Sequence, residues 1–237
     1  MNKKLKWILI IVASVLVLTS LLYLFLGYLP KKRKEQELRE AVEAYYNAKI
    51  ASYEEENASY KPYEVDVAFI GDSLTDGYDL KTYYPDIVTA NRGIGGDTTF
   101  GVEERLKVSL YDLKPKVVVM LIGANNFSTM FENYERILIG LRDNLPESEI
   151  VLLSLTSMGQ NWGKNNHLAA YNNVKIKALA EKYGYSFIDI YTPLLNMETD
   201  AIYEEYTTDG GHLTPLGYEV LTREITPVIK ELLENYN

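Results

Sequence analysis

Residues 65–77, VDVAFIGDSLTDG, decide the fold, because an apolar run at 65–70 passes directly into a polar turn that contains two glycines. Further apolar runs rich in Val and Ile follow at 117–122, 150–155 and 187–190, with a weaker run near 87–90. Stretches with helical periodicity lie between or after them, at 100–113, 130–144, 168–183 and 216–236. Alternating strands and helices indicate a parallel sheet covered by helices on both faces. Residues 63–237 are therefore predicted to form one three-layer α/β/α domain.

The composition excludes several classes of protein. Of the 237 residues, 47% are hydrophobic and 24% are charged, which is typical of a folded globular chain rather than a disordered one. The absence of cysteine excludes disulfides, thiolate metal sites and a cysteine nucleophile. The two histidines, His167 and His212, are too few for a metal site built from several imidazoles.

Charge is distributed unevenly along the chain. Residues 1–34 hold seven of the 24 Lys and Arg residues and no acid, which leaves 17 bases against 33 acids in the remainder. A body this acidic repels phosphate backbones, so the sequence argues against nucleic-acid binding.

The basic residues of 1–34 flank a candidate membrane anchor. Residues 7–29, WILIIVASVLVLTSLLYLFLGYL, carry no charge, and at about 1.5 Å per residue they span a hydrocarbon core of roughly 30 Å. A cleaved signal peptide is the alternative, but this run is longer than the usual apolar region and no A-x-A-like site follows it. Basic residues on both sides nearly balance, so orientation is inferred only from the short basic N-terminus, which favours an extracytoplasmic body.

Residues 35–62 are predicted to form a juxtamembrane helix or linker that ends before Pro62. A narrow apolar stripe is formed by residues at helical spacing, namely Leu38, Val42, Tyr45, Tyr46 and Ile50. A helix that packs on the body and a solvated stalk both fit this pattern.

Four polar segments stand where the predicted strands end or the last helix begins: GDSLTDG (71–77), NRGIGGDTT (91–99), GANNF (123–127) and TTDGGHLTP (207–215). The carboxyl ends of parallel strands meet at one edge of a sheet, where ligands bind in such folds. We therefore expect these segments to form a site.

Ser73 is the candidate nucleophile of this site. It lies between a buried strand and a predicted helix, a position that exposes a hydroxyl and directs helix N–H groups at developing negative charge. A serine hydroxyl needs a base, and His212 is the better candidate because Asp209 precedes it by three residues and can fix its tautomer. Taken alone, a serine at a strand end is usually a helix cap, and a lone histidine is usually a surface or packing residue.

Gly96 and Asn125 are candidate donors to an oxyanion. A glycine lets a backbone N–H approach closely, and an asparagine offers a neutral side-chain NH₂. Each also fits a plain glycine turn or an Asx-turn.

Together these residues resemble the SGNH (GDSL) hydrolases. The blocks Gly71-Asp72-Ser73-Leu74, Gly96 in NRGIGGDTT, Asn125 in GANN, and Asp209 with His212 in DGGH match that family in chain order over roughly residues 66–225. The NRGIGGDTT and GANN motifs are similar to those of the branch that contains platelet-activating-factor acetylhydrolase subunits and lysophospholipase-like esterases. Asn126 departs from the pattern, since many members have Asp there. The resemblance implies a flavodoxin-like α/β/α fold.

The resemblance also implies an ester hydrolase with a Ser73–His212–Asp209 triad and an oxyanion hole made by Ser73 N–H, Gly96 N–H and Asn125. No metal or cofactor is then required. The expected substrate is an acyl ester of a carbohydrate or lipid, and short acyl chains are favoured. An acyltransferase that uses the same site on a surface polysaccharide, and a non-catalytic glycan- or partner-binding domain, are the alternatives.

Two residues are assigned to substrate binding, Asp72 and Trp162. Trp162 is the aromatic residue of the polar segment 156–167, which is either a rim for a sugar face or a flexible solvated loop. His167 is expected to start a helix rather than to bind a ligand.

Overall fold

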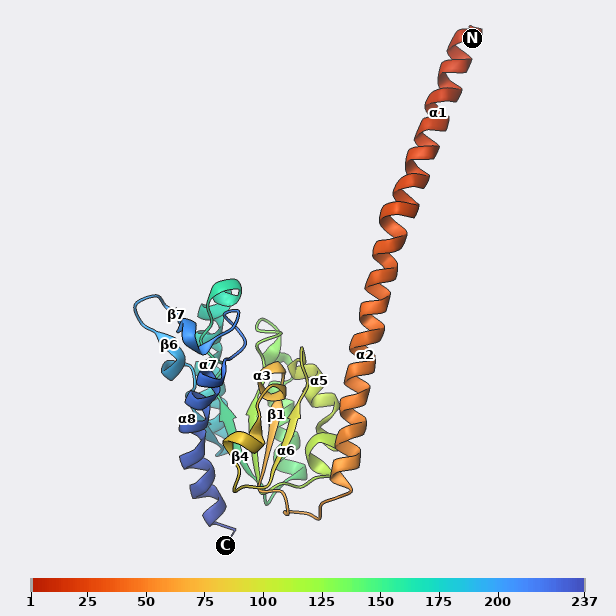
Figure 1. The fold of residues 1–237 in the computed structure, drawn as a ribbon. Helices are drawn as coiled ribbons and strands as arrows, with labels where there is room; N and C mark the ends of the chain where they lie inside the picture. The colour runs from red at the N-terminus through yellow and green to blue at the C-terminus, as the bar shows by residue number, and fades with distance from the viewer. Residues whose placement is uncertain (1, 237) are drawn as a thin grey trace. The chain divides into compact units, whose positions relative to one another are not determined.

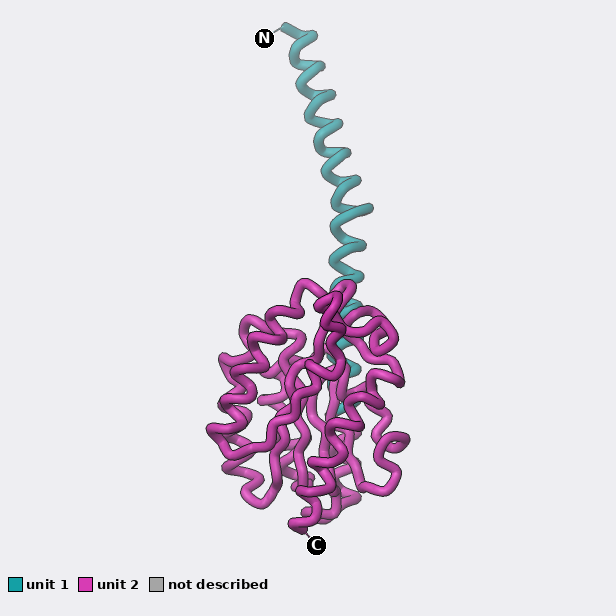
Figure 2. The backbone as a smooth tube through the Cα atoms, turned by 90° about the vertical axis from the view of Figure 1, so that its left-hand side faces the viewer, with its two compact units in different colours: residues 1–49 teal, residues 50–237 magenta. Residues whose placement is uncertain are grey.

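The computed structural model describes residues 2–236 and divides into two compact units, residues 1–49 and 50–237 (Figure 2). Each unit is described separately.

The first unit is helical throughout its described part. Helix α1 (Lys3–Tyr23) passes through a π-helical turn (Leu24–Tyr28) into α2 (Leu29–Asn57), whose last turns belong to the second unit. Asn2 caps the start, since its side chain accepts from the Lys4 N–H at 3.2 Å. The apolar side chains of α1 are exposed, and this helix is long and apolar enough to cross a membrane or to be a signal sequence.

The second unit is built on a five-stranded parallel sheet, visible in Figure 1. The strand order is β2-β1-β3-β4-β5, with β1 (Val67–Gly71) paired to β2 and β3. The other strands are β2 (Thr89–Gly93), β3 (Val117–Leu121), β4 (Glu149–Leu153) and β5 (Ser186–Ile188). All of β1 and β3 is buried, which fits the near-continuous apolar runs in their sequences. The predicted α/β class with a parallel sheet is confirmed.

Helices and short elements connect the strands. The helices are α3 (Ser73–Asp76), α4 (Leu80–Tyr83), α5 (Thr99–Glu104), α6 (Tyr134–Asn144), α7 (Asn166–Tyr183) and α8 (Pro215–Glu234). A π-helical turn spans Lys107–Tyr111, and 3₁₀ turns lie at Met130–Glu132, Gln160–Asn165, Thr192–Leu194 and Glu204–Tyr206. A two-stranded antiparallel ribbon, β6 (Leu195–Asn196) with β7 (Ala201–Ile202), follows β5.

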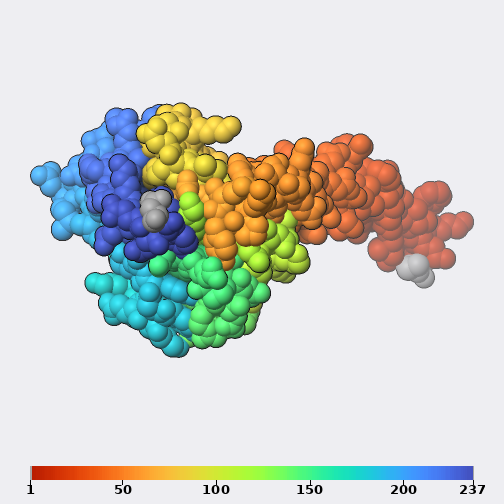
Figure 3. Space-filling model, turned by 90° about the horizontal axis from the view of Figure 1, so that it is seen from below, coloured from red at the N-terminus to blue at the C-terminus, as the bar shows by residue number. Residues whose placement is uncertain are grey.

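The helices form a layer on each face of the sheet. Helix α6 joins α5 through Arg136–Glu103 and joins α7 through an ion pair of Glu135 with Lys182. On the other face, α8 covers the segment that carries α3 and α4, where Tyr218 stacks on Tyr78. Figure 3 shows α8 in dark blue beside that segment in yellow, with α6 and α7 in green and cyan across the molecule. This is the three-layer arrangement expected from the sequence.

Several predicted bounds differ from the structure. The helix expected over 100–113 is divided into α5 and the π-helical turn, with a break at Arg105, whose side chain turns into the protein. The weak strand near 87–90 lies two to three residues later, as β2. The helix expected to end before Pro62 already ends at Asn57.

Candidate active site

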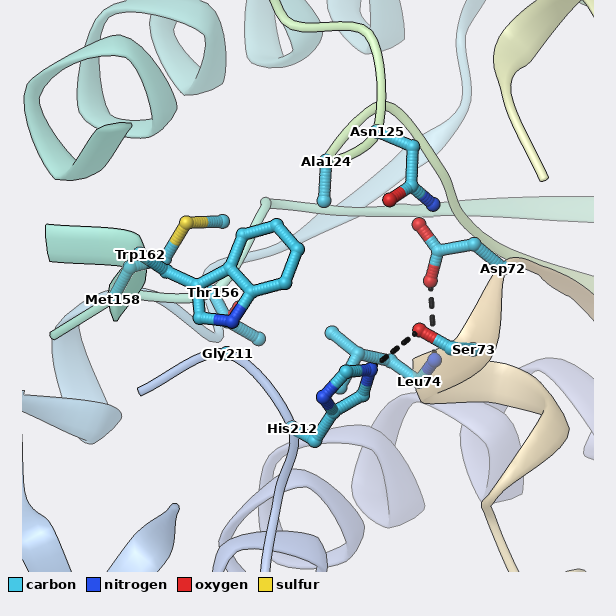
Figure 4. Close-up of a pocket in the computed structure, with 10 residues that line it drawn as sticks. All are labelled: Asp72, Ser73, Leu74, Ala124, Asn125, Thr156, Met158, Trp162, Gly211 and His212. Atoms are coloured by element: carbon cyan, nitrogen blue, oxygen red, sulfur yellow. Dashed lines mark hydrogen bonds between the residues drawn. The ribbon is translucent and has the colours of Figure 1, made fainter. Parts of the chain in front are cut away.

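The carboxyl edge of the sheet carries a pocket (Figure 4). Its lining comes from the turn after β1, from the loops after β3 and β4, and from the loop before α8, in the order Asp72, Ser73, Leu74, Ala124, Asn125, Thr156, Met158, Trp162, Gly211 and His212. Three of the four segments predicted to meet at this edge line the pocket, whereas the segment 91–99, which contains Gly96, contributes none of these residues.

Ser73 is placed by a close approach of β1 and β3. A side chain at Gly71 would lie 2.1 Å from the Leu121 carbonyl oxygen, so only glycine allows this spacing. Asp72 then caps α3, accepting from the Leu74 N–H at 3.1 Å, and Ser73 becomes the first residue of that helix. The Tyr218 hydroxyl of α8 donates to the Leu74 carbonyl at 2.9 Å, which fixes the turn from the opposite element.

His212 reaches Ser73 from the loop before α8, and the two side chains point toward one another in Figure 4. Ser73 Oγ lies 3.1 Å from His212 Nε2, and His212 Nδ1 lies 2.8 Å from Asp209 Oδ2. If Nδ1 carries the proton that it shares with Asp209, Nε2 is free to accept from the Ser73 hydroxyl. The three side chains predicted to act together thus form one hydrogen-bonded chain.

The loop that holds Asp209 and His212 is tightly turned. Asp209 Oδ1 accepts from the His212 and Gly211 N–H groups at 2.8 and 2.9 Å. Gly210 has φ +90°, and a side chain there would strike the Gly159 carbonyl at 2.0 Å, so the turn requires glycine. Gly159 N–H donates to the Gly210 carbonyl at 2.9 Å and joins this loop to the one after β4.

The two carboxyl groups near Ser73 are perturbed in opposite directions. Burial is the largest influence on both and works to raise each pKa. For Asp72, which is 2% exposed, burial prevails and raises the pKa to about 7. For Asp209, hydrogen bonds from the backbone and ring of His212 and from Gly211 outweigh burial and hold the pKa below its usual range. Asp209 is therefore ionised at neutral pH.

Asn125, in the loop after β3, lines the pocket, whereas Gly96, in the loop after β2, does not. Asn125 is exposed, and its Nδ2 donates to the Asp97 carbonyl at 2.8 Å, which fixes the amide plane. Gly96 has φ +78° and would have no atom within 4 Å of an added Cβ, so its backbone is open to solvent. Asn126, the departure from the family pattern, donates to Thr99 Oγ1 at 2.9 Å and accepts from the Thr99 N–H at 3.3 Å. It joins the loop after β3 to α5.

Trp162 forms the wall opposite Ser73. Its indole contacts the imidazole of His212 edge to face, with ring centroids 6.1 Å apart and planes at 90°. The segment predicted as either a rim or a solvated loop is thus folded into a 3₁₀ turn whose Trp162 is half-buried against the site. His167 lies in the first turn of α7, as expected, and is exposed outside the pocket.

Sequence analysis missed other lining residues, notably Ala124, Thr156 and Met158. Thr156 and Met158 are buried, although their segment has no regular apolar pattern that could have identified them. Among residues 2–236, no group of three or more His, Asp or Glu side chains is arranged to hold a metal ion.

Comparison with known proteins agrees with this architecture. The model of the GDSL-like lipase/acylhydrolase family matches residues 69–220. Platelet-activating factor acetylhydrolase IB subunit alpha2 of Rattus norvegicus is 31% identical over 184 residues, covering 73% of this chain and 80% of that protein.

Two solved structures share the fold. A GDSL-like lipase of Bacteroides thetaiotaomicron has a TM-score of 0.69 at 24% identity and covers 77% of this chain and 97% of its own. An acetylxylan esterase of Geobacillus stearothermophilus has a TM-score of 0.59 at 18% identity, with coverage of 71% and 95%. The family match spans most of the second unit, and the chain belongs to the GDSL-like lipase/acylhydrolase family of ester hydrolases.

Proposed function

We propose that this chain is a membrane-anchored serine esterase that removes a short acyl group, foremost acetyl, from a carbohydrate or lipid ester. The observation that carries the proposal is the chain of contacts from Ser73 Oγ through the His212 ring to Asp209, with separations of 3.1 and 2.8 Å. A surface serine or a simple helix cap has no need of an imidazole held in one tautomer by an ionised carboxylate.

In the proposed mechanism the Ser73 hydroxyl attacks the ester carbonyl carbon while His212 Nε2 takes its proton. Asp209 stabilises the imidazolium that forms, and the protonated ring then gives its proton to the departing alcohol oxygen. A water molecule, deprotonated by the same nitrogen, attacks the acyl-serine carbonyl carbon. His212 then returns that proton to Ser73 Oγ as the acyl–Oγ bond breaks, which releases the carboxylic acid and restores the serine.

The oxyanion of both tetrahedral intermediates is assigned to the N–H groups of Ser73 and Gly96 and to Asn125 Nδ2. Asn125 lines the pocket with Ser73, and its Nδ2 donates to the carbonyl of Asp97, the residue that follows Gly96. Loss of one such donor typically lowers kcat by about 10²–10³.

Three features support a short acyl group and a polar or lipid alcohol. The pocket wall around Ser73 includes the apolar side chains Leu74, Ala124 and Met158. Relatives and fold neighbours are named for the release of acetyl groups, from platelet-activating factor in one case and from xylan in another. The apolar helix at the N-terminus would hold the domain at a membrane surface, where acylated lipids and surface polymers are close by.

The test is hydrolysis of p-nitrophenyl acetate by the full chain and by Ser73→Ala. We expect the variant to lose turnover by a factor of at least about 10³, with an unchanged circular dichroism spectrum. Ser59→Ala, at an exposed position after α2, is the matched control and should keep full activity. Turnover retained by Ser73→Ala would contradict the proposal.

The substrate side is tested with a panel of acetyl, butyryl and longer esters and with acetylated sugars. We expect kcat/KM to fall as the acyl chain lengthens, because Leu74, Ala124 and Met158 line the pocket beside Ser73 and leave little room for a longer chain. Adding an unacetylated sugar acceptor distinguishes hydrolysis from transfer, since an acyltransferase would form acetylated acceptor in place of free acetate.

A further inference from the structure

Arg105 is a buried cation outside the pocket that the proposed mechanism does not use. It lies just after α5 and is 2% exposed. Its Nε donates to Asp97 Oδ2 at 2.8 Å, and its Nη2 donates to the Gly71 carbonyl at 3.0 Å. Its Nη1 donates to the Arg92 carbonyl and to Ser109 Oγ, both at 2.9 Å.

Three of these four partners lie in different segments near the carboxyl edge of the sheet. Gly71 ends β1, two residues before Ser73, and Arg92 is near the end of β2. Asp97 lies in the loop after β2, next to Gly96. One planar guanidinium therefore holds together the strand end that leads to the serine, the neighbouring strand end, and the loop of the proposed oxyanion donors.

Asp97 links Arg105 to Asn125. Its backbone carbonyl accepts from Asn125 Nδ2 at 2.8 Å, while its Oδ1 accepts from the Thr98 N–H at 2.8 Å. Asp97 is 8% exposed, so its carboxylate depends on Arg105 as its buried counter-ion. A Cβ at Gly96 would touch nothing within 4 Å, so side-chain packing does not fix that position.

We propose that Arg105 is a positioning residue for the oxyanion hole: through Asp97 it holds the Gly96 backbone and the Asn125 amide at a fixed distance from Ser73. The inference rests on the proposed esterase function. Its physical basis is that donors arranged in advance stabilise the developing charge without reorganising, and that misplacement by about 1 Å can cost on the order of 10² in rate.

The chain supplies a matched control, Arg92. Its side chain is also fully buried, but its guanidinium faces α2, where it pairs with Glu56 and donates to Asn57 Oδ1 at 3.0 Å. Arg92→Met and Arg105→Met each remove a buried cation from an ion pair, and both should lower Tm. Only Arg105→Met should lower kcat for p-nitrophenyl acetate, by about 10- to 100-fold, with KM within about 3-fold of wild type.

Two further measurements separate positioning from plain stability. Arg105→Met combined with Asp97→Asn removes the orphaned charge, so the double variant should regain Tm without regaining kcat. In the double variant Arg105→Met with Asn125→Ala, the fold-loss in kcat should be much smaller than the product of the two single fold-losses, because both residues act on the same oxyanion. Arg105→Lys, which keeps the charge for Asp97 but cannot reach all the carbonyls, should recover part of kcat and provides a folded variant if Arg105→Met does not fold.

The outcomes are distinguishable. Suppose that the wild type hydrolyses the ester. The inference about Arg105 is then overturned if Arg105→Met lowers kcat no more than Arg92→Met does, or if the fold-loss in kcat of the double variant with Asn125→Ala equals the product of the single fold-losses. The esterase proposal stands in either case. If the wild type does not hydrolyse esters, or Ser73→Ala keeps the activity, the proposed function fails and the inference fails with it.

Discussion

Asp72, next to Ser73, and Asp209, bonded to His212, have carboxyl groups whose pKa values are shifted in opposite directions. Asp72 is enclosed, and its hydrogen bond from the Leu74 N–H does not offset the burial, which raises its pKa to about 7. Asp209 accepts hydrogen bonds from two backbone N–H groups and the His212 ring, so it stays charged despite partial burial. A carboxylate that is kept ionised suits a partner for an imidazolium, whereas a protonated one does not.

Replacing Asp209 tests whether an ionised carboxylate is needed to support His212 as the base. Asp209→Asn keeps the size of the side chain but removes the charge and offers an NH₂ where the ring needs an acceptor, which favours the wrong tautomer. We expect kcat for p-nitrophenyl acetate to fall by about 10³–10⁴, with little change in KM. Activity within 10-fold of wild type in a folded variant would show that Asp209 does not support the base.

Asp72 gives a prediction about stability. Its pKa of about 7 in the folded state lies above the ordinary value of 3.8, so the folded state keeps a proton that the unfolded chain releases. The stabilisation from this proton is complete below about pH 4 and is lost as pH rises through about 7. Asp72→Asn keeps the cap on Leu74 and has no proton to lose. We expect the variant to gain roughly 1–4 kcal/mol over wild type between pH 5 and pH 8.

Thermal unfolding of both proteins at pH 5 and pH 8 measures this gain. Comparing the two proteins cancels the titration of Asp209, which they share. Identical pH dependence of Tm in wild type and Asp72→Asn would mean that Asp72 is ionised across the range.

At the scale of elements, two loops meet at Gly211 and Trp162. A side chain at Gly211 would lie 2.7 Å from the indole, so Gly211→Ala must displace Trp162 and disturb its contact with His212. We expect KM for acetyl esters to rise several-fold and, in a Trp7→Phe background that leaves Trp162 as the single tryptophan, a red-shifted emission. Gly163→Ala, in the same 3₁₀ turn with open space at its Cβ, is the control and should change neither. An unshifted emission in Gly211→Ala would contradict the contact.

The elements that sequence analysis predicted well are those with a strong local pattern. The run VVVML of β3 is buried at every position. A strand that is covered by helices on both faces of its sheet needs apolar residues at every position, so its sequence reads as a continuous apolar run. The short ribbon of β6 and β7 was missed because two residues per strand give no periodicity. The break after α5 was missed because its cause is tertiary: Arg105 bonds to two strand ends rather than extending a helix.

The same distinction applies to the site. Ser73, Asn125 and His212 were predictable because short motifs carry them to strand ends or to the start of the last helix, where parallel topology forces them together. The link between Asp97 and Arg105 was not, since an ion pair between a loop and the residue after a helix leaves no repeating signal in the sequence. The contact of Trp162 with Gly211 depends likewise on two loops far apart in the chain.

At the scale of the whole molecule, the basic N-terminal segment and the acidic remainder constrain membrane association. Residues 35–237 hold 17 bases and 33 acids, so an anionic lipid surface would repel them. Under the proposed membrane anchoring, attachment would depend on the apolar helix of residues 7–29, whose side chains are exposed along α1. An integral anchor of this kind resists high salt, whereas a protein adsorbed peripherally by charge is released by it.

We expect the full chain expressed in a bacterium to remain in the membrane fraction after washes with high salt and alkaline carbonate, and to be released only by detergent. A chain that lacks residues 2–34 should appear in the soluble fraction and still hydrolyse acetyl esters, because every residue of the proposed mechanism lies in the second unit. Mass spectrometry of the membrane-bound protein should recover peptides that contain Trp7, since an uncleaved anchor retains them. Recovery of a soluble, shortened product from the full-length gene would instead identify the segment as a cleaved signal peptide.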